Sequence, residues 1–278
     1  MLSKRVVTAL WGIPLLAATI WFEKPLPWFT LFTAIWGGLA VFEFFKLVST
    51  LKVFPFSYFG LGWTLLFIVS RDSDLLSLLE PHFALSLLTP LLLASAILLS
   101  LVWLILRTQK EQAFTSWAWT LAGIIYVGWL LSYLVALRGL EDGRNWVFLA
   151  LFATFASDTT AFFVGRAWGR HRLAPSISPG KTCEGAIGGI LGAITASLFF
   201  MLPTPLNLHL NWGQAILVGL LASIIGQLGD LVESLFKRNI GVKDSGRLVP
   251  GHGGFLDRMD SVVFTGIVVY YYVIWVIQ

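Results

Sequence analysis

The sequence predicts an all-α, polytopic membrane protein, and three observations support this fold class. Of the 278 residues, 57% are hydrophobic and only 12% are charged, which gives a mean hydropathy of +0.80. Apolar runs of about 20 residues, the length that crosses a bilayer as a helix, recur along the whole chain. Charged side chains gather in two stretches of the C-terminal half. This composition lies outside the range of soluble globular proteins.

Nine stretches have the length and composition of transmembrane helices. They are 6–22, 26–42, 53–70, 83–106, 113–137, 146–165, 186–202, 214–232 and 261–277. The first five contain no charged residue within these bounds, whereas Asp158 lies in the sixth and Asp230 in the eighth. Ionisable groups at membrane depth are costly and usually face a polar cavity. We therefore expect the C-terminal helices to form a polar cavity that faces the cytoplasm, although Asp158 could instead lie near a helix end.

The distribution of cations predicts the orientation of the chain. If all nine helices span the membrane, fifteen of the 19 Lys and Arg residues lie on the side of the N-terminus. The other side holds Lys24, Arg71, Arg138 and Arg144. Cytoplasmic loops carry the excess of cations, so the N-terminus and both polar stretches are expected in the cytoplasm, with the protein in the inner membrane. The net charge of +4 does not indicate a nucleic-acid partner, because the cations lie between apolar runs.

The contrast between the two halves predicts two regions. Residues 1–145 are expected to be packing helices that face lipid or a dimer partner, and residues 146–278 the catalytic region with two cytoplasmic polar loops. Two small-xxx-small pairs, Gly185 with Gly189 and Gly188 with Gly192, permit close helix contact. Such contact can form within the subunit or in a homodimer.

The first polar stretch, 165–185, contains a dense set of side chains that donate hydrogen bonds suited to phosphate. Gly180-Lys181-Thr182 has the ending of a phosphate-binding P-loop, but Pro175 stands where that motif needs glycine, and no strand is expected before it. The donors suited to a polyphosphate are Ser178, Lys181, Thr182, Arg166, Arg170 and Arg172. A basic loop that attracts anionic lipid head groups explains the same residues equally well.

The second polar stretch, with the residues just before it, balances five cations against five acids. The cations are Lys237, Arg238, Lys243, Arg247 and Arg258, and the acids are Asp230, Glu233, Asp244, Asp257 and Asp260. Carboxylates repel a phosphate ligand unless a divalent cation stands between them, so the balance indicates metal plus phosphate. The spacing from Asp230 to Arg238 places five polar residues on one helical face if the eighth helix continues beyond its predicted end. The turn 250–254 is rich in glycine, so its N–H groups can approach an anion.

The order of these residues resembles the signature of the CDP-diacylglycerol synthases, also called phosphatidate cytidylyltransferases. The matching positions are Ser234, Lys237, Arg238, Lys243, Asp244, Pro250, His252, Gly253, Gly254, Asp257, Arg258 and Asp260. Further matches are Asp158-Thr159 with Ala161, Gly165-Arg166, and the run from Ser178 to Gly185. The resemblance covers about the C-terminal half of the chain. Cys183 departs from it, because the family usually has a tryptophan there.

The resemblance implies attack of the phosphate of phosphatidic acid on the α-phosphorus of CTP, with Mg²⁺ and, if a second site exists, another metal ion. It implies metal binding by Asp230 and Asp257 first, then by Asp260, Asp244 and Asp158. It implies nucleotide or phosphate contacts by Ser178, Lys181, Thr182, Lys237, Arg238, Lys243 and Arg258. The catalytic set is Lys237, Arg238, Asp257 and His252. His252 could act as a general acid, stabilise the turn or contact phosphate.

Two other functions are also compatible with the sequence. A related CTP-dependent lipid enzyme, either a polyprenol kinase or an ether-lipid synthase, would share much of the chemistry. An ion-coupled transporter would use Asp158 and Asp230 as an intramembrane relay. The transporter reading predicts two related halves, whereas polar residues gather only in the second half.

Overall fold

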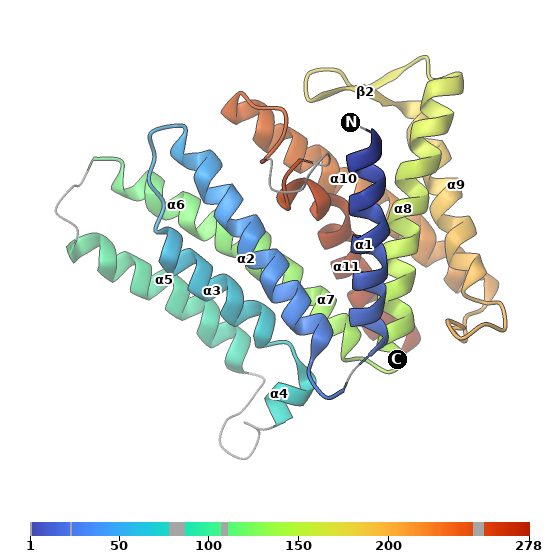
Figure 1. Cartoon of the computed structure of the whole chain (residues 1–278), viewed down its shortest axis with the longest axis horizontal. Helices are drawn as coiled ribbons and strands as arrows, with labels where there is room; N and C mark the ends of the chain where they lie inside the picture. The colour runs from blue at the N-terminus through green and yellow to red at the C-terminus, as the bar shows by residue number, and fades with distance from the viewer. Residues whose placement is uncertain (1, 23, 78–86, 107–110, 247–252) are drawn as a thin grey trace. The chain divides into compact units, whose positions relative to one another are not determined.

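The computed structural model describes residues 2–22, 24–77, 87–106, 111–246 and 253–278, with side chains from residue 10 onward in the first of these ranges. Within them the chain is mostly helical, and two short strands form one hairpin (Figure 1). The all-α fold class is therefore confirmed. The helices of the N-terminal half are α1 (Leu2–Trp21), α2 (Trp28–Ser49), α3 (Ser57–Val69), α4 (Ser73–Ser77), α5 (Leu88–Leu106), α6 (Ala113–Gly123), η2 (Ile124–Trp129) and α7 (Leu130–Arg138). The remaining elements are α8 (Gly143–Trp168), β1 (Arg172–Ala174), β2 (Ser178–Thr182), α9 (Cys183–Phe199), α10 (Trp212–Ile240), η3 (Leu256–Arg258), α11 (Asp260–Tyr272) and η4 (Val273–Ile277).

Each of the nine predicted stretches contains a helix. Within the described residues, six helices are long and apolar enough to cross a membrane: Trp28–Ser49, Leu88–Leu106, Ala113–Arg138, Gly143–Trp168, Trp212–Ile240 and Asp260–Ile277. The other three stretches correspond to shorter apolar helices, Leu10–Trp21, Ser57–Val69 and Cys183–Phe199. The chain is thus a multi-pass membrane protein by helix length and composition.

The first compact unit comprises Met1–Gly139 together with Asp244–Asp257. In it α2 packs on α3, and the π-helical segment η2 packs on α3 as well. Phe45 of α2 is almost fully buried, and its ring lies where any side chain at Gly60 or Gly123 would collide. These glycines therefore let α3 and α6 approach α2 closely, which builds the core of this unit.

The structure corrects the predicted end of the second helix. We expected that helix to end at Phe42 and the first five helices to carry no charge. In the structure α2 continues to Ser49 and includes Glu43 and Lys46. No glycine or proline interrupts the sequence between Phe42 and Ser49, so nothing in the local sequence ends the helix earlier.

The second compact unit comprises Leu140–Lys243 and Arg258–Gln278. In it α9 lies along α8, and α10 packs on α9 and α11 (Figure 1). A side chain at Gly188 would collide with Val164 of α8, and one at Gly192 would collide with Thr160. The two small-xxx-small pairs therefore serve helix packing inside this unit.

A short antiparallel hairpin precedes α9. Arg172 of β1 pairs with Thr182 of β2, and Ala174 pairs with Ser178. The expectation that no strand precedes Gly180-Lys181-Thr182 was wrong, because these residues lie in β2 and lead directly into α9. The P-loop is still excluded, because Pro175 occupies the required glycine position.

Candidate functional site

Helix α10 carries the polar face of the second unit. Its N-terminus is fixed by a capping box in which Asn211 and Gln214 bond to each other's backbone N–H groups. The helix extends to Ile240, well past the predicted end at residue 232, and Gly241 ends it in the left-handed conformation, with φ at 81°. The predicted polar face from Asp230 to Arg238 is therefore helical throughout, as expected.

The two polar stretches of the sequence meet at an ion pair. Nζ of Lys181, in β2, lies 2.7 Å from Oδ2 of Asp230, in α10. Their side chains are 24% and 31% exposed, so water screens the pair only in part. Ser234 donates from Oγ to the other Asp230 oxygen, at 3.3 Å. The predicted phosphate contact Lys181 and the predicted metal ligand Asp230 thus neutralise each other in this structure.

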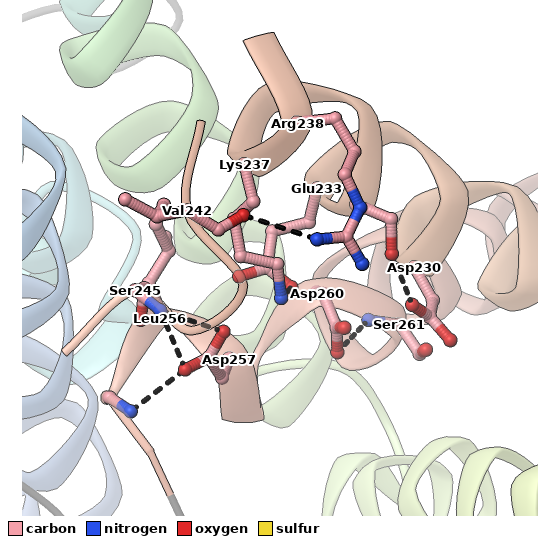
Figure 2. A network of polar contacts seen from close by, with 12 residues as sticks. Asp230, Glu233, Lys237, Arg238, Val242, Ser245, Leu256, Asp257, Asp260 and Ser261 are labelled. Carbon is pink, nitrogen blue, oxygen red and sulfur yellow. Dashed lines mark hydrogen bonds and ion pairs between the residues drawn. The ribbon is translucent and has the colours of Figure 1, made fainter. Parts of the chain in front are cut away.

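A second and more buried ion pair lies on the same helix. Glu233 is fully buried, and its Oε2 is 3.3 Å from Nζ of Lys237, one helical turn later. Asp260, at the start of α11, lies near Glu233. Asp260 in turn accepts the N–H of Ser261 at 2.7 Å (Figure 2). A buried carboxylate without such partners would be costly, so these contacts are what allow Glu233 to lie inside the protein.

Asp158 belongs to the same group of charges. It lies ten residues before the end of α8, which argues against its interpretation as a helix-end residue. The charges of Asp260, Asp230, Lys181 and Arg258 all act on its carboxyl group. We call the acids Asp158, Asp230, Glu233 and Asp260 the C-terminal acidic cluster. With Lys181, Lys237 and Arg258 it makes a polar centre in the second unit.

The described residues of the signature segment, 244–246 and 253–257, belong to the first unit, together with the N-terminal helices. The Asp257 carboxylate accepts the N–H of Ser245 at 2.9 Å and the N–H of Gly254 at 2.8 Å, both through Oδ2 (Figure 2). Oδ1 also accepts the Ser245 N–H, at 3.2 Å. Asp257 therefore organises the backbone of its own segment, a role that the sequence pattern did not predict.

Glu43 of α2 is a buried acid that our sequence analysis missed. Its side chain is 3% exposed, and Oε2 accepts the N–H of Leu256 at 3.1 Å and the hydroxyl of Ser245 at 3.3 Å. The residue lies one position beyond the predicted end of its helix. A lone acid between Phe42 and Phe44 was the available signal, because an ionisable group inside an apolar run needs a partner.

Two other predicted contact residues, Arg238 and Thr182, form hydrogen bonds with backbone groups. Arg238 donates from one terminal nitrogen to the Val242 carbonyl at 3.3 Å (Figure 2). Its Nε donates to the Ile177 carbonyl at 3.1 Å. Thr182 is nearly buried and caps α9 by accepting the Gly185 N–H at 3.1 Å. Its hydroxyl oxygen therefore already serves the helix, as N-cap residues commonly do.

The remaining predicted residues are accessible or fall outside the described ranges. Arg258, Lys243 and Asp244 are exposed, and Ser178 is half-buried. His252 and Arg247 lie outside the described residues, as does most of the glycine-rich turn 250–254.

The predicted metal ligands are divided between the two units. Asp158, Asp230 and Asp260 belong to the second unit, whereas Asp244 and Asp257 belong to the first. Among the residues that the structure describes, no three His, Cys, Asp or Glu side chains form a group that could hold a metal ion. The metal assignments from sequence remain predictions.

The junction between the hairpin and α9 carries a carboxylate that precedes the apolar stretch 186–202. Glu184 lies in the first turn of α9 and contacts His171, whose Nδ1 is 2.6 Å from Oε1. It also accepts the N–H groups of Arg170 and His171. The pKa of Glu184 is lowered to about 2, first by a hydrogen bond from its own backbone N–H and then by one with the His171 side chain. The two N–H groups of Arg170 and His171 lower it further. Glu184 therefore fixes the start of the hairpin to the start of α9.

Nearly the whole chain is similar to known proteins. Residues 3–276 match the profile of the cytidylyltransferase family. The chain belongs to this family. A phosphatidate cytidylyltransferase of Brucella abortus biovar 1 (strain 9-941) is 36% identical over 275 residues, which are 97% of this chain and 92% of the relative.

Two further relatives are more similar over shorter lengths. A phosphatidate cytidylyltransferase of Staphylococcus haemolyticus is 43% identical over 157 residues, 56% of this chain and 59% of the relative. One of Bacillus subtilis (strain 168) is 39% identical over 170 residues, 61% of this chain and 62% of the relative. These two alignments thus span about three fifths of each relative, whereas the Brucella alignment spans nearly all of it.

Proposed function

We propose that this protein transfers the CMP moiety of CTP to phosphatidic acid, forming CDP-diacylglycerol and pyrophosphate. The observation that carries the proposal is the ion pair between Lys181 and Asp230. It joins the two polar stretches that resemble the phosphatidate cytidylyltransferase signature, within a chain that belongs to the cytidylyltransferase family. The relatives that carry this enzyme name support the same activity.

The residues suit the chemistry of this reaction. An oxygen of the lipid phosphate forms the new bond to the α-phosphorus, and the bond from that phosphorus to the pyrophosphate oxygen breaks. The attacking phosphate is already ionised near neutral pH, so no general base is required. The protein must align two anions and stabilise the charge on the leaving pyrophosphate. Lys181, Lys237 and Arg238 are suited to both tasks as cations, and Arg258 adds a fourth positive charge in the same unit.

We propose Mg²⁺ as the cofactor, and the donor chemistry fits it. Magnesium is usually held by one or two carboxylates, with water and substrate phosphates completing its shell, so a preformed group of three acids is not required. The C-terminal acidic cluster offers carboxylates of this kind, and Asp230 is our first choice, with Asp260 and Asp158 after it. In the first unit we assign Asp257, with Asp244 after it. When bound, the metal would neutralise phosphate charge during transfer.

The placement in the cell is also a proposal. We propose that all nine apolar helices, including the three shorter ones, span the inner membrane, and that the polar centre opens to the cytoplasm. The excess of Lys and Arg on the side of the N-terminus supports this orientation. Cytoplasmic access is also what a CTP-dependent reaction needs. A homodimer stays a prediction, because packing of α9 on α8 already accounts for the glycine pairs.

The test uses purified protein in detergent with phosphatidic acid, CTP labelled in its cytidine and Mg²⁺. We expect the label to enter the organic phase, and we expect EDTA to stop this transfer and added Mg²⁺ to restore it. CTP labelled only at the γ-phosphate is the matched control, because its label should leave with pyrophosphate. Label from γ-phosphate in lipid would indicate a kinase, and no cytidine label in lipid would overturn the proposal.

A further inference from the structure

Two side chains of α2 contact consecutive residues of the signature segment. Nε1 of Trp36 donates to the carbonyl of Phe255 at 3.2 Å, and Oε2 of Glu43 accepts the N–H of Leu256 at 3.1 Å. Trp36 and Glu43 are seven residues apart, about two helical turns, so they lie on the same face of α2. The Trp36 ring also packs edge-on against the Phe255 ring, with centroids 5.1 Å apart.

The contacts of Glu43 continue to Asp257. The Glu43 carboxylate accepts the Ser245 hydroxyl, and the Ser245 backbone N–H donates to the Asp257 carboxylate. Leu256, which Glu43 also holds, is the residue next to Asp257. Ser245 and Leu256 are both buried, so water does not replace these hydrogen bonds cheaply. All of these residues belong to the first compact unit.

Two glycines permit this close approach. A side chain at Gly246 or at Gly254 would collide with the Glu43 carboxyl group. Only glycine lets the backbone pass so near an acid. The two glycines therefore let the backbone lie against the Glu43 carboxylate. The carboxylate accepts hydrogen bonds that this backbone would otherwise make with water.

We propose that Glu43 and Trp36 are positioning residues that hold the signature segment and thereby orient the Asp257 carboxylate. Glu43 acts as a hydrogen-bond acceptor and makes no contact with substrate in this scheme. The N-terminal half, predicted to supply packing helices, then has a direct part in setting the geometry of a predicted catalytic residue. The expected loss of activity rests on the proposed function, whereas the expected loss of order in the segment does not.

The test compares Glu43→Ala, Glu43→Gln and Trp36→Phe with wild type, and Phe42→Ala serves as the matched control. Phe42 is the neighbouring residue on α2, but its side chain is 54% exposed. Hydrogen exchange of a peptide covering 253–257, followed by mass spectrometry in detergent, reports the order of the segment without any substrate. Unfolding temperature checks that each variant is folded.

We expect exchange in this peptide to be about tenfold faster or more in Glu43→Ala, because a buried N–H loses its acceptor. Glu43→Gln should stay within about threefold of wild type, because the amide oxygen can accept both bonds. Trp36→Phe should accelerate exchange by a smaller factor, since it removes one bond and keeps a ring. Phe42→Ala should match wild type.

In cytidylyl transfer we expect kcat of Glu43→Ala to fall about tenfold or more, with the KM for phosphatidic acid nearly unchanged and Glu43→Gln restoring most of kcat. Wild-type exchange at 253–257 in a folded Glu43→Ala protein would overturn the proposal. So would a Glu43→Gln protein as impaired as Glu43→Ala, because charge rather than acceptor geometry would then matter. If Glu43→Ala does not fold, Glu43→Gln and Trp36→Phe decide the matter by the same measurements. Absence of transfer in wild type would refute the proposed function and leave the exchange comparison valid.

Discussion

The ion pair between Lys181 and Asp230 should be a measurable source of stability. At 2.7 Å, two unit charges attract by about 6 kcal/mol if the effective dielectric constant is about 20, and by about 1.5 kcal/mol if it is that of water. The side chains are 24% and 31% exposed, so solvent screening and the cost of partial desolvation both reduce the net value. We expect a coupling free energy of about 1–2 kcal/mol.

A double-mutant cycle measures this quantity. Lys181→Met and Asp230→Asn each remove one charge, and the double variant removes both. Unfolding would be followed by circular dichroism while sodium dodecyl sulfate is titrated into mixed micelles. Each single substitution should lower the free energy of unfolding by more than half of the loss seen in the double variant. The reason is that each single substitution leaves one half-buried charge without its partner.

The control cycle combines Asp230→Asn with Lys243→Met, since Lys243 is an exposed cation of the same unit. These two changes should be additive within about 0.5 kcal/mol. A coupling below about 0.5 kcal/mol between Lys181 and Asp230 would refute the argument that partial burial makes their pairing significant. Equal coupling in both cycles would show that the effect is general electrostatics rather than this contact.

Three further predictions concern single residues. Asp257→Asn should abolish cytidylyl transfer and destabilise the protein by about 1–3 kcal/mol, because the amide nitrogen that replaces Oδ1 would face the Ser245 N–H, a donor against a donor; wild-type turnover of the purified variant would contradict this. Lys237→Ala should raise the KM for CTP more than that for lipid and cost about 3 kcal/mol, because it leaves buried Glu233 without its cation; kinetics and unfolding test both parts, and an unchanged KM for CTP would remove the nucleotide contact. Glu184 has a lowered pKa, so its stabilising effect should be present above about pH 4.5 and be lost as pH falls through about 2. The difference in unfolding temperature between wild type and Glu184→Gln should therefore shrink as pH falls from 5 toward 2, and a constant difference would refute the assignment.

The sequence predicted the helices well because membrane spans depend on local composition. Every predicted stretch contains a helix, and the extension of α10 beyond residue 232 meets the condition under which its polar residues share one face. Contacts between residues far apart in the sequence were harder to predict. The pairing of Lys181 with Asp230 joins residues 49 positions apart, and periodicity within one helix carries no information about such contacts.

Glu43 shows why the remaining part of the site was missed. Its role depends on hydrogen bonds to Ser245 and Leu256, more than 200 residues later in the chain. A single acid at the end of an apolar run gives a weak signal, and the predicted boundary at Phe42 excluded it. The hairpin was missed for a different reason: β1 and β2 have three and five residues, too few for an alternating pattern to stand out.

The path of the chain between the two compact units limits how the protein can be truncated. After Lys243 the backbone leaves the second unit, contributes Asp244–Asp257 to the first, and returns at Arg258. A fragment that starts at Leu140 would keep the whole signature in its sequence but would lose Trp36, Glu43 and the helices around them. Ser245 and Leu256, buried in the intact chain, would then be exposed without their acceptor. A search or an expression strategy based on the C-terminal motif alone would therefore recover a segment that has lost the partners it folds with.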